Sequence, residues 1–120
     1  MKTLAFAVLP AAALLASPAT AQFGQVNDPA PGYSSLMNSN YSGAEREIRG
    51  ANVSKYDPAR SINLGVALAK QGRKDEAARQ FNKVLLEADV EMVVADGKTV
   101  MSHDLARYAL ASLQDGVLSR

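Results

Sequence analysis

The chain has 120 residues, which is enough for one small domain and no more. It contains no cysteine, which excludes disulfides and thiolate chemistry, and its formal net charge is only +1. Domains that bind nucleic acid usually carry a clear basic excess, so this balance argues against nucleic acid as a partner.

Residues 1–21 have the pattern of a secretory signal peptide: a lysine near the start, an apolar run, and Ala19-Thr20-Ala21 as a small-residue cleavage site. The alternative is a membrane anchor. The apolar run is shorter than the roughly 20 residues that a span needs, and Pro10 interrupts it. We therefore predict cleavage after Ala21, with no stable membrane anchor afterwards. The short, alanine-rich leader favours a bacterial protein that is periplasmic or secreted.

Residues 22–39 are rich in glutamine, asparagine, proline, glycine and serine, and they show no periodic apolar pattern. Pro29 and Pro31 argue against a helix. We predict a flexible N-terminal arm. The alternative is an arm that docks on the domain through Phe23, Tyr33 and Leu36.

The domain itself is predicted to cover residues 40–120 and to begin with a helix over residues 40–54. Ala44, Ile48 and Ala51 form its apolar stripe. Charged residues lie on the opposite face, and Gly50 weakens the helix near its end.

Two short amphipathic helices follow. Asp57 is a good N-cap and Pro58 suits the first helical position, so the first helix begins there. Its apolar residues form two stripes, which predicts neighbours on two sides. Gly72 ends it, because glycine adopts a left-handed conformation without strain. The second helix begins at Asp75 and Glu76.

Gly65 lies inside the first of these helices, where glycine costs about 1 kcal/mol relative to alanine. A close approach of another backbone explains such a glycine. We expect Ala77 of the second helix to be its small partner.

The stretch 58–91 resembles the tetratricopeptide repeat, a helix-turn-helix unit. Ser61 and Asp89 depart from the family pattern, which has an aromatic residue and a proline at these positions. Residues 40–54 look like the second helix of a preceding repeat. The resemblance implies an all-α fold of antiparallel helical hairpins, about one and a half to two repeats long. The matching residues are Leu64, Gly65, Leu68, Gly72, Ala77 and Phe81.

An insertion at residues 92–101 interrupts the repeat pattern. Asp96-Gly97 lies between two runs of β-branched and apolar residues, which predicts a small β-hairpin with a type I′ turn. A last helix is expected over residues 103–117, with Ser102 as its N-cap. It should pack beside the first helix of the central repeat.

The sequence offers little chemistry. His103 is the only histidine, and no second metal ligand stands at a suitable spacing, so we expect no metal, no cofactor and no catalytic residue. Lys70, Arg73 and Lys74 cluster at the central turn, where they form either an anion site or a solvated loop; the loop is the preferred interpretation.

In the tetratricopeptide family, the inner face of each first helix grips an extended partner, and an asparagine at the position of Asn63 holds the partner's backbone. We therefore expect a non-enzymatic adaptor or assembly helper that binds another protein or peptide. Asn63→Ala and Val66→Glu should weaken capture without unfolding. A self-associating oligomer is the first alternative, and a small enzyme or metal protein centred on His103 is the second. The candidate partner-binding residues are Ile62, Asn63, Val66, Ala69, Lys70, Tyr108 and Gln114.

Overall fold

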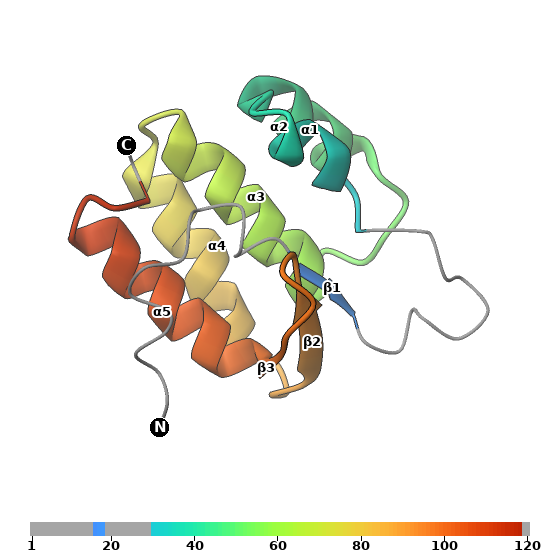
Figure 1. The fold of residues 1–120 in the computed structure, drawn as a ribbon, viewed down its shortest axis with the longest axis vertical. Helices are drawn as coiled ribbons and strands as arrows, with labels where there is room; N and C mark the ends of the chain where they lie inside the picture. The colour runs from blue at the N-terminus through green and yellow to red at the C-terminus, as the bar shows by residue number, and fades with distance from the viewer. Residues whose placement is uncertain (1–15, 19–29, 119–120) are drawn as a thin grey trace.

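The computed structural model describes residues 16–18 and 30–118. This part of the chain is mostly helical and carries one small antiparallel sheet, which confirms the predicted fold class at that level (Figure 1). The elements are β1 (Ala16–Pro18), α1 (Tyr33–Met37), α2 (Tyr41–Gly50), α3 (Pro58–Lys70), α4 (Lys74–Leu86), β2 (Glu91–Val94), β3 (Thr99–Met101) and α5 (Ser102–Gln114).

The four longer helices stack in chain order. Helix α3 packs between α2 and α4, and α5 lies along the other side of α4 (Figure 1). The last helix was expected beside α3, but it packs mainly on α4 and touches α3 less. Packing between successive helices is what short connections produce in helical hairpins.

The turn between α3 and α4 follows the chemistry of its residues. The side chain of Asp57 accepts a hydrogen bond from the backbone N–H of Arg60 and caps the start of α3. At the other end Gly72 has φ +82°, and the N–H of Arg73 donates to the carbonyl of Leu68 over 3.0 Å. With a second bond from the Gly72 N–H to the carbonyl of Ala69, this is a Schellman motif.

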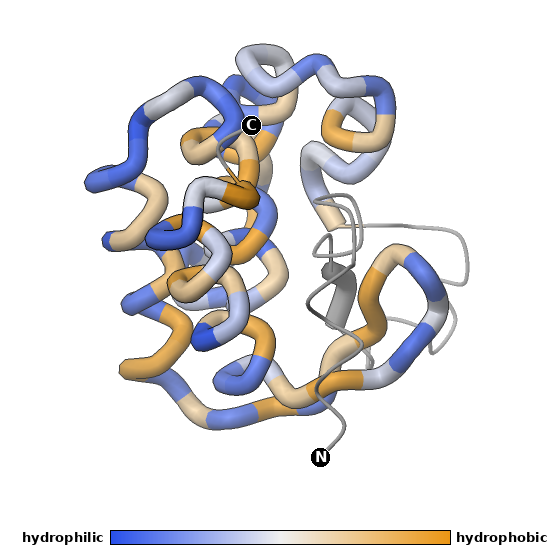
Figure 2. The backbone as a smooth tube through the Cα atoms, turned by 60° about the vertical axis from the view of Figure 1, so that its left-hand side comes forward, coloured by the Kyte–Doolittle hydropathy of each residue, from blue (hydrophilic) through white to orange (hydrophobic). Residues whose placement is uncertain are grey.

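Helix α3 is the centre of the hydrophobic core. Every residue from 61 to 69 is buried, whereas the neighbouring helices bury only one face. Figure 2 shows hydrophobic and hydrophilic residues alternating along the helical backbone. The expectation of neighbours on two sides is confirmed, since α2 and α4 flank it and β1 also contacts it. A helix that is apolar all round is stable only when it is covered on all sides.

Gly65 has a close neighbour, but not the expected one. A Cβ atom at this position would lie 2.4 Å from Cε1 and 2.8 Å from Cζ of Phe81. The three nearest atoms all belong to the Phe81 ring, so a Cβ at residue 65 would meet this ring before it met Ala77. The glycine therefore makes room for an aromatic ring between α3 and α4.

The N-terminal arm differs from its prediction in its described part. Residues 33–37 form helix α1 and pack on α2, with Leu36 and Ala30 buried. Pro31 does not prevent this helix because it stands before the first turn, where a missing N–H is harmless. The docking alternative holds for Leu36 and in part for the half-buried Tyr33, while Phe23 lies outside the described residues.

The β-hairpin forms, but its turn is not type I′. Gly97 has φ +88°, and Asp96 does not share a positive φ. The N–H of Val94 donates to the carbonyl of Lys98, and the N–H of Gly97 donates to the carbonyl of Val94. This is a three-residue loop in which the left-handed glycine makes a bulge.

A third strand, β1, pairs antiparallel with β2 over Ala16 to Pro18. These three residues belong to the predicted leader. The rest of that segment, including the predicted cleavage site at residues 19–21, lies outside the described residues.

Candidate functional site

The predicted partner-binding surface is largely inside the molecule. Ile62, Asn63 and Ala69 are 0% exposed and Val66 is 1% exposed. These four positions are buried in the full-length chain, in which α2, α4 and β1 all contact α3. Because β1 belongs to the predicted leader, partner binding at this face of the mature chain stays a prediction. In the full-length chain the same burial predicts that Val66→Glu destabilises the fold, contrary to the expectation from the sequence.

The other three predicted residues lie at accessible positions. Lys70 ends α3, is half-buried and stands 6.0 Å from the centre of the Tyr41 ring, a cation–π contact. Tyr108 is half-buried and Gln114 is exposed, both on α5. Partner binding through these three residues of α3 and α5 stays a prediction.

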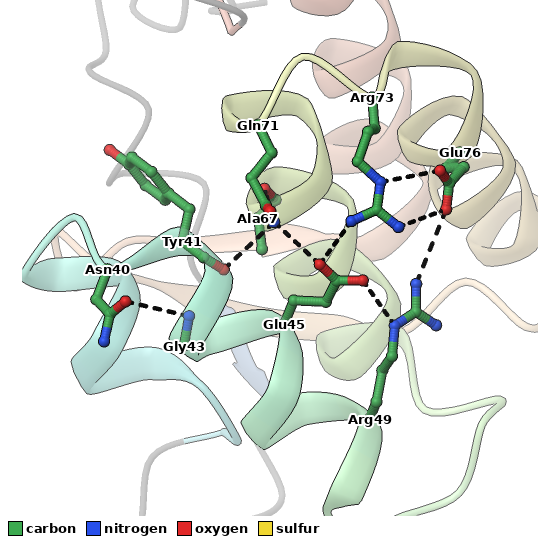
Figure 3. A network of polar contacts seen from close by, with 9 residues as sticks. All are labelled: Asn40, Tyr41, Gly43, Glu45, Arg49, Ala67, Gln71, Arg73 and Glu76. Carbon is green, nitrogen blue, oxygen red and sulfur yellow. Dashed lines mark hydrogen bonds and ion pairs between the residues drawn. The ribbon is translucent and has the colours of Figure 1, made fainter.

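A network of charged groups joins α2 to the turn between α3 and α4 (Figure 3). The Glu45 carboxylate accepts hydrogen bonds from Arg49 Nε at 2.9 Å, Gln71 Nε2 at 3.1 Å and Arg73 Nη1 at 2.7 Å. Arg73 also donates two bonds of 2.9 Å to Glu76. Two carboxylates thus face two guanidinium groups, and the network carries no net charge.

These contacts also set the pKa values of the carboxyl groups. Burial raises the pKa of Glu45, but hydrogen bonds from Arg49, Gln71 and Arg73 outweigh it and hold the pKa below its usual value. Hydrogen bonding from Arg73 likewise lowers the pKa of Glu76. Hydrogen bonds to Glu76 and Glu45 raise the pKa of Arg73, which stays charged at any physiological pH.

The network bears on whether the basic residues at this turn can bind an anion. An open hollow of about 290 Å³ is lined by residues 72–76. Its main cation, Arg73, already satisfies Glu45 and Glu76. An anionic ligand that used Arg73 would have to compete with both carboxylates, so Arg73 serves to hold the helices together.

His103 is part of the helix start rather than of a reactive site. Its backbone N–H donates to the Asp89 carboxylate at 2.9 Å, and its Nε2 lies 2.7 Å from the carbonyl oxygen of Glu87. Ser102 was predicted as the N-cap, but it is the first residue of α5, and its Oγ accepts from the Val90 N–H. Asp89 supplies the cap from outside the helix.

One exposed apolar group was missed in the sequence. Leu86 is 82% exposed, and Val90 and Met101, close to the base of the β-hairpin, are more than one third exposed. The signal was present, because Leu86 falls outside the apolar stripe of its own helix. Val90 and Met101 lie close together, because the Ser102 N–H donates to the Val90 carbonyl, and neighbouring exposed apolar residues are typical of a contact surface.

Across residues 16–18 and 30–118, no group of three or more histidine, cysteine or acidic residues is arranged to hold a metal ion. Within the same ranges, every helix is too short or too polar to span a bilayer. No protein-family model matches the chain, and neither curated proteins nor solved structures gave a match.

Proposed function

We propose that this chain is an exported, non-enzymatic helical protein of tetratricopeptide type that binds another protein in the bacterial periplasm. The observation that supports the repeat type best is the α3–α4 hairpin. It is closed by a Schellman turn at Gly72 and packed through Gly65 against Phe81, and all three are positions at which the chain resembles the repeat.

The stacking of α2 to α5 in chain order supports the same proposal, because repeat proteins bury their core between neighbouring helices. The chemistry of the polar groups agrees with a binding role. At the central turn Arg73 is paired with Glu45 and Glu76, and His103 is engaged at a helix start. Lys70, Tyr108 and Gln114 are the accessible residues of the predicted surface that such a partner would meet.

The test is crosslinking in intact cells with the tagged full-length chain, followed by fractionation and mass spectrometry of the adducts. A dominant adduct with one foreign protein in the periplasmic fraction is the expected result. Recovery of the protein only from the cytoplasm, or no foreign adduct under conditions that crosslink a known pair, contradicts the proposal.

A second candidate function is self-association, which the exposed Leu86, Val90 and Met101 favour. Short repeat arrays expose apolar surface at their two ends, and a second copy of the chain can cover that surface. Sedimentation over a wide concentration range separates the two candidates. A mass that stays monomeric rules out the oligomer, and a dimer that Leu86→Lys dissociates supports it.

A further inference from the structure

Strand β2 has a neighbour on each side (Figure 1). Toward β3, the Val94 N–H donates to the Lys98 carbonyl at 2.9 Å, and the register pairs Met92 with Val100. Consecutive residues of an antiparallel strand direct their backbone groups to opposite sides. The N–H and C=O of Val93 therefore point toward β1, where Val93 pairs with Ser17.

The place of β1 is a slot with two walls. Val93 offers its backbone N–H and C=O at the edge, and helix α3 contacts the strand from the core side. Met92 and Val94 are buried beside it, so the slot lies against the apolar interior. An extended chain in this slot gains both ladder hydrogen bonds and apolar contact.

The strand that fills this slot belongs to the predicted leader. Cleavage after Ala21 removes residues 16–18, so β2 becomes an edge strand and the backbone groups of Val93 lose their partners. We propose that this vacated edge binds an extended segment of a partner protein as an added strand, antiparallel to β2. The proposal rests on the proposed function, because it requires an exported chain that meets a partner.

The residues that occupy the slot indicate the chemistry of the partner segment. The paired positions carry Ala16, Ser17 and Pro18, which are small and uncharged. A matching segment therefore has small, uncharged residues at three consecutive positions. The β2 strand of a second copy carries a methionine and two valines there and suits the slot less well.

Two proline variants give a matched test. Val93 and Thr99 face each other in the β2–β3 ladder. Hydrogen-bonded and non-bonded pairs alternate along such a ladder, and the adjacent pair Val94 and Lys98 is bonded, so Val93 and Thr99 exchange no hydrogen bond. Val93→Pro removes the N–H that faces the slot, and Thr99→Pro removes the N–H on the opposite, outer edge of the sheet. Both leave the bonds between β2 and β3 in place, and circular dichroism verifies that both variants fold.

The full-length chain is expressed with its own leader, and the exported product is recovered and weighed by mass spectrometry. Its binding to a labelled peptide of residues 11–20 is measured by fluorescence anisotropy, beside a matched peptide with Ser17→Pro. Wild type and Thr99→Pro should bind the first peptide. Val93→Pro, and the altered peptide on wild type, should bind at least roughly tenfold more weakly.

Equal binding by Val93→Pro overturns the proposal, and so does a lack of binding by every variant. A product whose mass still includes residues 16–18 also overturns it, because the edge is then filled. So does a dimer that only Val93→Pro dissociates, because the occupant is then a second copy. If Val93→Pro still forms foreign adducts in cells, strand binding at the slot is refuted but the proposed function stands. If wild type forms no foreign adduct, the proposed function is refuted.

Discussion

Gly65→Ala tests the packing at the centre of the fold. The added Cβ would lie 2.4 Å from a carbon of the fully buried Phe81 ring, so the ring or the helix must shift to make room. Overpacking of a core costs about 1–3 kcal/mol. Alanine recovers about 1 kcal/mol of helix propensity. We therefore expect a net loss of about 1 kcal/mol, which lowers Tm by about 4–8 °C in a domain of this size.

Gly50→Ala is the matched control, because no atom lies within 4 Å of a Cβ at Gly50, at the end of α2. It gains propensity without a clash, so we expect unchanged or slightly higher stability. Thermal melts and urea unfolding, both followed by circular dichroism, measure the two variants side by side. If Gly65→Ala is as stable as Gly50→Ala, the close contact with Phe81 does not constrain the hairpin.

A double-mutant cycle attributes the effect to the ring. Phe81→Leu alone leaves space and destabilises the hairpin, but it also removes ring atoms that a Cβ at residue 65 would meet. The combined variant should therefore lose less stability than the two single losses added together. Strict additivity would place the cause outside this contact.

Three further predictions concern charge and burial. The pKa of Glu45 lies below its usual 4.5 in the folded state, so its stabilising contribution is complete above pH 4.5 and is lost as the pH falls through the folded-state pKa. Glu45→Gln should therefore reduce the loss of unfolding free energy that wild type shows on acidification. Burial raises the pKa of Asp57, so the ionised form of this carboxyl adds no stability at pH 7, and Asp57→Asn should keep the cap without loss. Asp57→Ala should lower the unfolding free energy from urea titrations by about 1 kcal/mol. Val66→Glu places a carboxyl in the core at a cost of about 5 kcal/mol and should leave the chain unfolded by circular dichroism, while the exposed Gln114→Glu should fold normally.

The helices were predictable because their signals are local. Asp57, Pro58 and Gly72 fix the limits of α3 through capping and backbone preference alone, and these assignments are confirmed. The stripe with Phe81 and Val84 likewise follows from helical spacing. Helix type and hairpin connection therefore needed no knowledge of distant residues.

The errors concern contacts between distant segments. Burial of Ile62 and Val66 depends on what covers α3, and β1, which is part of that cover, comes from a leader that was expected to play no part in the fold. The Glu45 network joins residues about 28 positions apart, so no spacing rule reveals it. The turn at Gly97 was read from one dipeptide, which fixes where a turn lies but not how many residues it contains.

The two connections that flank α4 differ greatly in length, and this difference bears on the order of folding. Residues 71–73 join α3 to α4, whereas residues 87–101 join α4 to α5. Closing the longer connection costs about 1.4 kcal/mol more in chain entropy. Helices α3 and α4 should therefore pair early, and α5 should join only after the β-hairpin has shortened its path. Substitutions in the interface between α3 and α4 should slow refolding, while those in α5 should mainly accelerate unfolding.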